Sequence, residues 1–518
     1  MATPSAKERK YDRQLRLWAA EGQAALENAH VCLLGATPTG CEIAKNIILP
    51  GLGSLTLVDS ASVSEEDTAS NFFVNIESIG SPRAMVTAQF LGELNPDAKV
   101  DGVVKDPAEL VGSEEASFWT QYDLVIACEL PLSTVEALSR LLFSKNIPLL
   151  ATDTVGFYGY MTLSVQEHTI IETHPDSLVE LRLDNPWPEL VDFCNLYDLE
   201  NLSPADHAHV PYVVLLQIYL KQWRDLHDGK LPQTYDEKKQ FKQMIMSHQP
   251  NDDPENYEQT VANVWRLAQR SGVPPDSVLA ITNDPKAQNV SSHSEPFWIL
   301  AAALKRYLDH PDSKGLLPLP GVLPDMKADS KGYVALQKIY REQAHKDFAR
   351  FKTIYLSILS ELGLRANVIS DAVAESFCKN AKFLKVVRGH PIVRDTSQLS
   401  YNYTEDSDDL FHIYVGLQAY KAFVESNGRA PGVDDSLSSE AQSILKHFDH
   451  SEVFPHTDKI LEEIKRAGGS QLHNIASFLG GTGAQEVIKA ITHQYIMMDG
   501  TMVYDGIGGK TAVLRFSN

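Results

Sequence analysis

A short turn near the N-terminus has the spacing of a phosphate-binding loop but not its composition. Nucleotide-binding strand–turn–helix units use the pattern GxGxxG, whose middle glycine lets the backbone approach a phosphate. In the segment GATPTG the outer positions are Gly35 and Gly40, but the middle one is Thr37. Pro38 has no N–H to donate and biases Thr37 towards an extended conformation. Each lost donor to a buried charged oxygen costs on the order of 1–3 kcal/mol. The turn is therefore expected to keep its packing glycines and to bind no phosphate.

The ribose-binding acid of a nucleotide-binding site has a counterpart in this chain, Asp59. This acid ends the next expected strand, about 20 residues after the turn, where dinucleotide-binding folds place the carboxylate that holds ribose hydroxyls. The same spacing fits an acid that only ends its strand and caps the next turn of the chain. Ligand binding needs both halves of the site, and only one is intact.

The five cysteines are Cys32, Cys41, Cys128, Cys194 and Cys378, an odd number without a CxxC pair. Their scatter argues against a disulfide framework and a structural zinc site, and for a reducing intracellular compartment. Cys32 and Cys128 fall within expected strands. Cys41 lies near a helix start, where the dipole lowers a thiol pKa, but a strand–helix packing contact there favours burial. Cys194 and Cys378 have no His or basic cluster beside them in the sequence, so no cysteine has the signature of a nucleophile.

Length and charge restrict the class of protein. A chain of 518 residues is too long for one simple core, so two or three domains are expected. The formal net charge of −22, from 68 acids against 46 bases, disfavours nucleic acid and anionic membranes and favours a basic partner. No apolar run has the length of a membrane span, and no secretion signal is expected at the N-terminus.

The elements that must position the turn alternate between strands and helices. The expected order is an amphipathic segment at 8–28, a strand at 30–34, a helix at 39–49, a strand at 54–59, a helix at 81–94, a strand at 123–128, a helix at 132–146, and strands at 148–152 and 160–166. Strands separated by helices of this length predict an α/β fold, with a parallel sheet covered on both faces.

The rest of the chain divides into a helical middle and a different tail. Residues 167–469 read as a mainly helical insertion, which includes an apolar, Pro- and Gly-rich connector at 315–333. Residues 470–518 predict a helix followed by a β-hairpin. A hairpin needs a sheet to join. We therefore expect a discontinuous Rossmann-like domain formed by residues 1–166 and 470–518.

Several segments together resemble the activating enzymes for ubiquitin-like modifiers, which share the ThiF/MoeB-like adenylation fold. The segments are KYDRQLRLWAAEGQAALENAHVCLLG, the strand end at Asp59, NIPLLATDTVGFYGYMTLSV, and IASFLGGTGAQEVIKAIT followed by YDG. EPFWIL and PDMKADSKGY in the helical insertion narrow the resemblance to the regulatory subunits of heterodimeric neddylation activating enzymes. In that family an active and an inactive adenylation fold work as a pair.

Departures from the active pattern make this chain similar to the inactive half. Thr37 and Pro38 replace the glycine turn, and residues 70–73, Ser-Asn-Phe-Phe, stand where active halves carry an SNLNRQ-like segment with a phosphate-binding arginine. The magnesium-binding Asp of active halves falls near Leu130. The resemblance therefore implies that this chain binds neither cofactor nor metal, and that ATP and Mg belong to the partner subunit.

For Arg13, helix periodicity and the family resemblance predict different roles. At 100° per residue Tyr11, Leu15 and Trp18 share one helix face and Arg13 points nearly opposite, which is typical of a solvated charge. The resemblance implies that the arginine of the YDRQ segment reaches in trans into the partner's ATP site, where it would stabilise phosphate charge as arginine fingers do.

The function implied by the resemblance belongs to a dimer. The chain would support ATP-dependent adenylation of the C-terminal glycine of a Nedd/Rub-type modifier, followed by thioester transfer to a cysteine of the catalytic subunit. The implied partners are that subunit and the modifier, with no nucleic acid and no membrane, in the cytoplasm or nucleus. Two other classes stay open at this stage, namely a self-sufficient dinucleotide-dependent oxidoreductase and a non-catalytic helical scaffold.

The connector is our candidate for a partner-contacting segment, because an apolar connector packs on something. The alternative is that it packs on its own helices. The candidate contact residues are Pro324, Asp325, Met326, Asp329, Tyr333 and Leu336.

Overall fold

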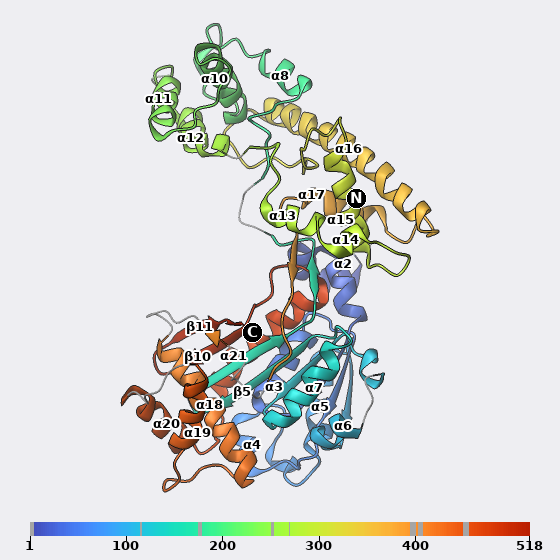
Figure 1. The fold of residues 1–518 in the computed structure, drawn as a ribbon, viewed down its shortest axis with the longest axis vertical. Coiled ribbons are helices and arrows are strands. Elements are labelled where there is room, and N and C mark those ends of the chain that lie inside the picture. Colours follow the sequence, from blue (N-terminus) through green and yellow to red (C-terminus); the bar gives the residue numbers. More distant parts are fainter. Residues whose placement is uncertain are drawn as a thin grey trace. The chain divides into compact units, whose positions relative to one another are not determined.

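The computed structural model describes residues 5–113, 117–174, 179–249, 253–268, 270–393, 400–401, 408–448 and 455–517. The chain forms two compact units (Figure 1). The first unit combines residues 1–168 with residues 386–518, and the second unit comprises residues 169–385. The first unit is therefore discontinuous in sequence.

An eight-stranded sheet forms the centre of the first unit, in the order β11-β10-β6-β5-β4-β1-β2-β3. Its strands are β1 (His30–Leu34), β2 (Ser54–Val58), β3 (Lys99–Val103), β4 (Leu124–Cys128), β5 (Leu149–Val155), β6 (Tyr158–Ser164), β10 (Thr501–Asp505) and β11 (Lys510–Leu514). The five strands from β3 to β5 are parallel, and β6, β10 and β11 are added antiparallel. The predicted α/β fold class is confirmed. The C-terminal hairpin joins this sheet through β10, which places Thr501 opposite Thr162 of β6.

Helices cover both faces of the sheet because the strand residues alternate in direction. Val31 and Leu33 of β1 join one core cluster with α3, α5 and α21, whereas Cys32 and Leu34 join another with α6 and α7. The helices and short elements of this part are α1 (Ala6–Lys10), α2 (Asp12–Asn28), α3 (Pro38–Ile48), α4 (Glu65–Ser70), η1 (Ile76–Ser78), α5 (Arg83–Leu94), α6 (Pro107–Ser113), η2 (Phe118–Gln121), α7 (Leu132–Phe143) and α21 (His473–Thr492).

Among the described residues between 386 and 469, three helices belong to the first unit and share a buried cluster with its sheet. They are α18 (Asp408–Asn427), α19 (Ser438–His447) and α20 (Pro455–Ala467), beside β10 and β11 in Figure 1. Phe411 and Val415 of α18 share a buried cluster with Tyr160 of β6 and Val503 of β10. The compact second unit is thus shorter than the helical insertion expected at 167–469, because the amphipathic pattern of these helices does not reveal which core they cover.

The second unit is built from helices around its own core. Its elements are α8 (Pro188–Cys194), α9 (Pro204–His207), α10 (Tyr212–Leu226), α11 (Tyr235–Met246), α12 (Glu255–Ala262), η3 (Val264–Ala268), α13 (Asp276–Thr282), α14 (Pro285–Gln288), α15 (Pro296–Asp309), α16 (Ser330–Glu361) and α17 (Asp371–Lys379). The short strands β7 (His168–Ile170) and β8 (Lys385–Val387) lie where the chain passes between units, and β9 (Ser400–Tyr401) pairs with β12 (Phe516–Ser517).

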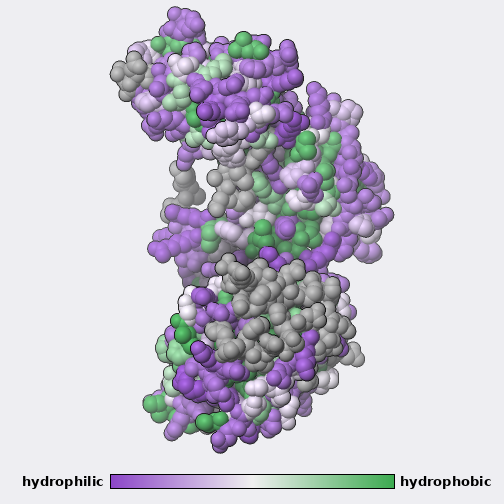
Figure 2. Space-filling view, turned by 60° about the vertical axis from the view of Figure 1, so that its left-hand side comes forward, coloured by the Kyte–Doolittle hydropathy of each residue, from purple (hydrophilic) through white to green (hydrophobic). Residues whose placement is uncertain are grey.

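The coloured residues on the face shown in Figure 2 are mainly hydrophilic, with groups of hydrophobic residues between them. Among the described residues, no helix combines the length and the apolar character required to span a membrane.

Gly480 lies at a close contact between α3 and α21 and provides a test of the packing. A Cβ at Gly480 would lie 2.4 Å from Cβ of Glu42, whereas a Cβ at Gly481 would meet no atom within 4 Å. We expect Gly480→Ala to destabilise the first unit by about 1–3 kcal/mol through overpacking. Gly481→Ala should stabilise it by about 0.5–1 kcal/mol, because alanine favours a helix. Urea unfolding of both variants measures the difference, and equal effects would contradict this packing.

Candidate functional site

The turn after β1 holds its two outer glycines for reasons of packing. Gly35 has a φ of +93°, and a Cβ there would lie 2.5 Å from the carbonyl oxygen of Cys128. A Cβ at Gly40 would lie 2.7 Å from the carbonyl oxygen of Gly35. Contacts this short leave no room for a side chain, so both glycines are needed for β1, α3 and β4 to approach.

The middle of the turn is occupied by the chain itself. Thr37 is extended (φ −78°, ψ 164°) and is the N-cap of α3, where its hydroxyl accepts a hydrogen bond from the N–H of Gly40 at 3.4 Å. Pro38 follows as the first helical residue and contributes no donor. One donor of the helix start is thus used by a side chain of the turn, and another is missing.

Asp59 is engaged by this chain's own donors. Its Oδ2 accepts hydrogen bonds from the N–H of Ala36 at 2.7 Å and from Nη2 of Arg83 at 2.8 Å, and its Oδ1 accepts one from the N–H of Ala61 at 2.7 Å. The residue is 4% exposed. Arg83 also binds Asp67 at 2.9 Å. Both carboxylate oxygens therefore have partners, and the acid holds the β2 end to α5 rather than facing an open ribose site.

The segment in place of the phosphate-binding arginine covers the turn. The side-chain amide of Asn71 donates to the carbonyl oxygen of Ala36 at 3.2 Å, and Asn71 is 1% exposed. Phe73 is buried, whereas Phe72 is 70% exposed and stacks on His473 with ring centroids 3.7 Å apart. Ser70 accepts a hydrogen bond through its carbonyl oxygen from Nδ1 of His473 at 3.0 Å. The segment thus attaches α21 to the turn and brings no cation to it.

A buried ion pair lies at the carboxyl ends of β4 and β5. Lys421 of α18 pairs with Asp153, and the hydroxyl of Tyr160 donates to the same carboxylate at 3.0 Å. Burial raises the pKa of the Asp153 carboxyl, an effect that the Lys421 ammonium opposes. Burial and the nearby Asp153 raise the pKa of Glu129 to about 8. Leu130, the residue at the magnesium-binding register, is buried.

Beyond these charged groups, the strand ends do not resemble a metal-dependent active site. Within the described ranges, no group of three or more His, Cys, Asp or Glu side chains is arranged to hold a metal ion. The cation at the carboxyl ends of β4 and β5 is the side chain of Lys421, which is paired with Asp153. Sequence reasoning missed Lys421, Arg83 and Glu129, and only the position of Glu129 beside the magnesium register was a signal that could have found one of them.

None of the five cysteines is prepared to act as a nucleophile. All five are buried. Burial raises the pKa of the Cys41 thiol to about 12 and that of the Cys194 thiol to about 12, and it also raises the pKa of Cys32, Cys128 and Cys378. A thiol with so high a pKa is protonated near neutral pH and is a poor nucleophile.

Arg13 lies in the first turn of α2 and is exposed, with no ion pair to any other described residue. The helix that carries it is held firmly. Tyr11 is 3% exposed and donates from its hydroxyl to Asp97 at 3.1 Å, and Trp18 is 7% exposed. Leu15 is half-buried. The structure therefore presents an exposed guanidinium in the first turn of α2, ahead of the kink at which Trp18 and Ala19 leave the helical conformation.

The connector residues are divided between the core and the surface. Leu336 is completely buried, and Met326 and Tyr333 are partly buried against the same core cluster. Asp329 caps α16 by accepting hydrogen bonds from two backbone N–H groups at 2.9 Å. The connector thus packs largely on its own helices, which was the alternative left open by the sequence. The burial of Leu336 removes it from the candidate contact residues, whereas Asp325 is exposed and Pro324 half-buried.

Comparisons with known proteins agree with this geometry. A model of the ThiF family matches residues 11–516. The chain is 39% identical over 530 residues to the NEDD8-activating enzyme E1 regulatory subunit of Xenopus laevis, and the match covers 98% of each chain. It is 37% identical over 538 residues to the Gallus gallus protein of the same name, with 99% and 100% coverage, and 36% identical over 534 residues to that of Danio rerio, with 99% of each covered.

The sheet, the strand-end turn and the family match define a protein of the ThiF class. Within this class the match to its relatives extends over nearly the full length of both chains. The chain belongs to the family of NEDD8-activating enzyme E1 regulatory subunits. The oxidoreductase alternative is not favoured by this membership.

Proposed function

We propose that this chain is the regulatory, non-catalytic half of a heterodimer that activates a Nedd/Rub-type ubiquitin-like modifier. The observation that carries the proposal is that this chain engages the groups of the turn itself: Thr37 accepts from the N–H of Gly40, and Asp59 accepts from the N–H of Ala36 and from Arg83. Two backbone donors of the turn are thus used within the chain and Pro38 has none to offer, although the fold is that of the ThiF class. The names of the full-length relatives support the same role.

In this proposal the catalytic subunit binds ATP and magnesium, adenylates the C-terminal glycine of the modifier, and receives the modifier on its own cysteine. The present chain supplies Arg13, whose free guanidinium adds positive charge beside the phosphates and the departing pyrophosphate. A cation that is fixed before the reaction stabilises such charge without having to reorganise. The chain itself binds no nucleotide, metal, nucleic acid or membrane, and acts in the cytoplasm or nucleus.

The outer side of α21 is the surface that we assign to the catalytic subunit. Phe478 is 41% exposed and stacks on Tyr504 with ring centroids 4.1 Å apart. The exposed Phe72 stacks on His473 at the start of the same helix. Exposed aromatic residues of this kind are typical anchors of protein interfaces. The connector contributes only its surface residues, such as Asp325.

ATP–pyrophosphate exchange tests the proposal. The assay is run with this chain alone, with the catalytic subunit alone, and with both together. We expect exchange above background only when both are present. Exchange by this chain alone would overturn the regulatory role. Tight binding of NAD or FAD to the isolated chain would instead support the oxidoreductase.

A further inference from the structure

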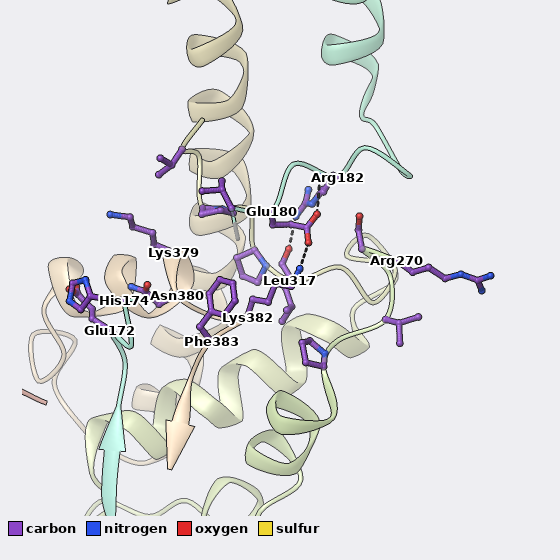
Figure 3. A pocket seen from close by; sticks show the side chains of 17 residues that line it. Glu172, His174, Glu180, Arg182, Arg270, Leu317, Lys379, Asn380, Lys382 and Phe383 are labelled. Carbon is purple, nitrogen blue, oxygen red and sulfur yellow. Dashed lines mark hydrogen bonds and ion pairs between the residues drawn. The ribbon is translucent and has the colours of Figure 1, made fainter. Parts of the chain in front are cut away.

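The second unit contains a groove that the proposed function does not use. Figure 3 shows its larger part, a cavity of about 540 Å³. A second cavity of about 450 Å³ adjoins it and shares the lining residues Glu172, Pro320, Val322 and Lys379. Each cavity falls within the size range of pockets that bind ligands. Together they form one groove along the segment from Leu317 to Val322.

The floor of the groove is fixed in position. The carbonyl oxygen of Leu317 accepts a hydrogen bond from Nη2 of Arg182 at 2.5 Å, and the N–H of Leu319 donates to Asp347 at 3.0 Å. Arg182 and Asp347 also form a buried ion pair at 2.6 Å. A Cβ at Gly321 would lie 2.7 Å from Cβ of Ala344, so the segment packs tightly against α16. A groove held in this way loses little conformational entropy when it binds a partner.

Two of the three glutamates that line the groove, Glu172 and Glu180, are already neutralised or hydrogen-bonded, whereas Glu375 is exposed at the smaller cavity. Glu180 forms an ion pair with Lys382 at 2.7 Å, drawn as a dashed line in Figure 3. Glu172 accepts a hydrogen bond from the hydroxyl of Ser376 and lies 3.6 Å from Nε2 of His174. Glu172 and Glu180 therefore contribute little net negative potential to the groove, and Glu375 is the acid whose charge opposes the basic residues of the smaller cavity.

The basic residues at its edges are not neutralised in the same way. Arg270 and Lys379 line the larger cavity, and Arg341 and His345 line the smaller one. All four are exposed, and within the described part of the chain none of them forms an ion pair. Figure 3 places Arg270 and Lys379 on opposite sides of the pocket, with Phe383 between them. Arg270, Lys379 and Arg341 outnumber the exposed Glu375, so in a chain of net charge −22 the groove carries a local excess of positive charge around an apolar floor.

We propose that this groove binds an extended, acidic segment of a partner protein. Apolar side chains of the segment contact the floor formed by Leu317, Pro320 and Phe383, and its Asp and Glu side chains face Arg270 and Lys379. Complementary charge at the edges sets the orientation and speeds association, while apolar contacts supply most of the affinity. The chain as a whole repels acidic molecules, so the attraction is confined to this site. The inference does not depend on the proposed function, because binding requires neither ATP nor a catalytic subunit.

An array of synthetic ten-residue peptides, which vary independently in acidic and apolar content, tests the inference on the full-length chain. We expect the bound peptides to combine Leu or Phe with several Asp or Glu, and binding to weaken with added salt. The double variant Arg270→Glu/Lys379→Glu should weaken the best acidic peptide at least about tenfold and shift the preference towards basic peptides. The side chain of Val322 is 40% exposed. Val322→Glu should weaken binding of the same peptide, although Arg270 and Lys379 keep their positive charge in this variant.

Charge-matched control substitutions distinguish an effect of the groove residues on peptide binding from an effect of the net charge of the chain. Lys239→Glu/Arg365→Glu changes two exposed basic residues of the same unit that do not line the groove. This control should bind the peptides like the unmodified chain. The inference is overturned if the array shows no preference for acidic over basic peptides, if the control loses as much affinity as the groove variant, or if single-stranded DNA competes as strongly as the best peptide.

Discussion

Replacement of Arg13 by alanine is expected to reduce ATP–pyrophosphate exchange by the reconstituted dimer about 100-fold or more, without loss of dimer assembly. The side chain is exposed and has no intramolecular ion pair in the described structure, so its removal leaves the fold of this chain intact. A single preorganised donor to developing charge is worth roughly 10²–10³ in rate, and arginines supplied in trans reach 10³–10⁵. Exchange kinetics at saturating ATP and modifier measure the effect.

The matched control is Arg16→Ala on the same helix. Arg16 is also exposed, but it forms an i,i+4 ion pair with Asp12 at 2.9 Å. Such a surface pair contributes only about 0.3–0.5 kcal/mol, so we expect this variant to behave like the unmodified dimer. Unchanged exchange by Arg13→Ala would remove the residue from the partner's site. Equal losses in both variants would point to general electrostatics of the helix.

Replacement of Lys421 by methionine is expected to destabilise the first unit by about 3–5 kcal/mol, because Asp153 is left buried without its counter-charge. Lys421 and Asp153 are 7% and 10% exposed at their side chains, and the remaining hydrogen-bond partner of the carboxylate is the hydroxyl of Tyr160. Urea unfolding measures the loss. Hydrogen exchange of peptides from β5 and α18 assigns the transition to the first unit, since a chain of two units need not unfold in one step.

The double variant Asp153→Asn/Lys421→Met should recover part of this stability, because it removes the unpaired charge together with its partner. Lys446→Met changes an exposed lysine on the neighbouring helix α19 and should alter stability by less than about 0.5 kcal/mol. A single variant Lys421→Met as stable as this control would show that the buried pair does not hold α18 to the sheet.

The parts of the fold that sequence reasoning predicted are those in which local pattern and tertiary structure agree. Residues 31–34 of β1 and 124–128 of β4 are continuous apolar runs, which is typical of buried parallel strands. The tail hairpin was recognised because its turn chemistry is local. Strand β3 was missed, since KVDGV is an edge strand with alternating exposure that includes Gly102.

The candidate site was only partly predictable for a related reason. The altered turn and Asp59 are visible as a short pattern in the sequence. The residues that occupy the site come from distant segments: Arg83 is 24 positions from Asp59, and Lys421 is 268 positions from Asp153. Their side chains meet only after the sheet and α18 have assembled. No local periodicity marks a lysine as the partner of a buried carboxylate on another element.

The insertion of the second unit between β6 and β10 has a consequence for biosynthesis. The sheet of the first unit needs β10, which pairs with β6 and follows the whole second unit in the chain. Until β10 has been synthesised, β6 is an open edge with unpaired backbone groups, which is a hazard for aggregation. The second unit is synthesised completely during that interval. We therefore expect the nascent chain to depend on chaperones that protect an exposed strand edge, and a chain that lacks residues 501–514 to aggregate although its second unit is whole.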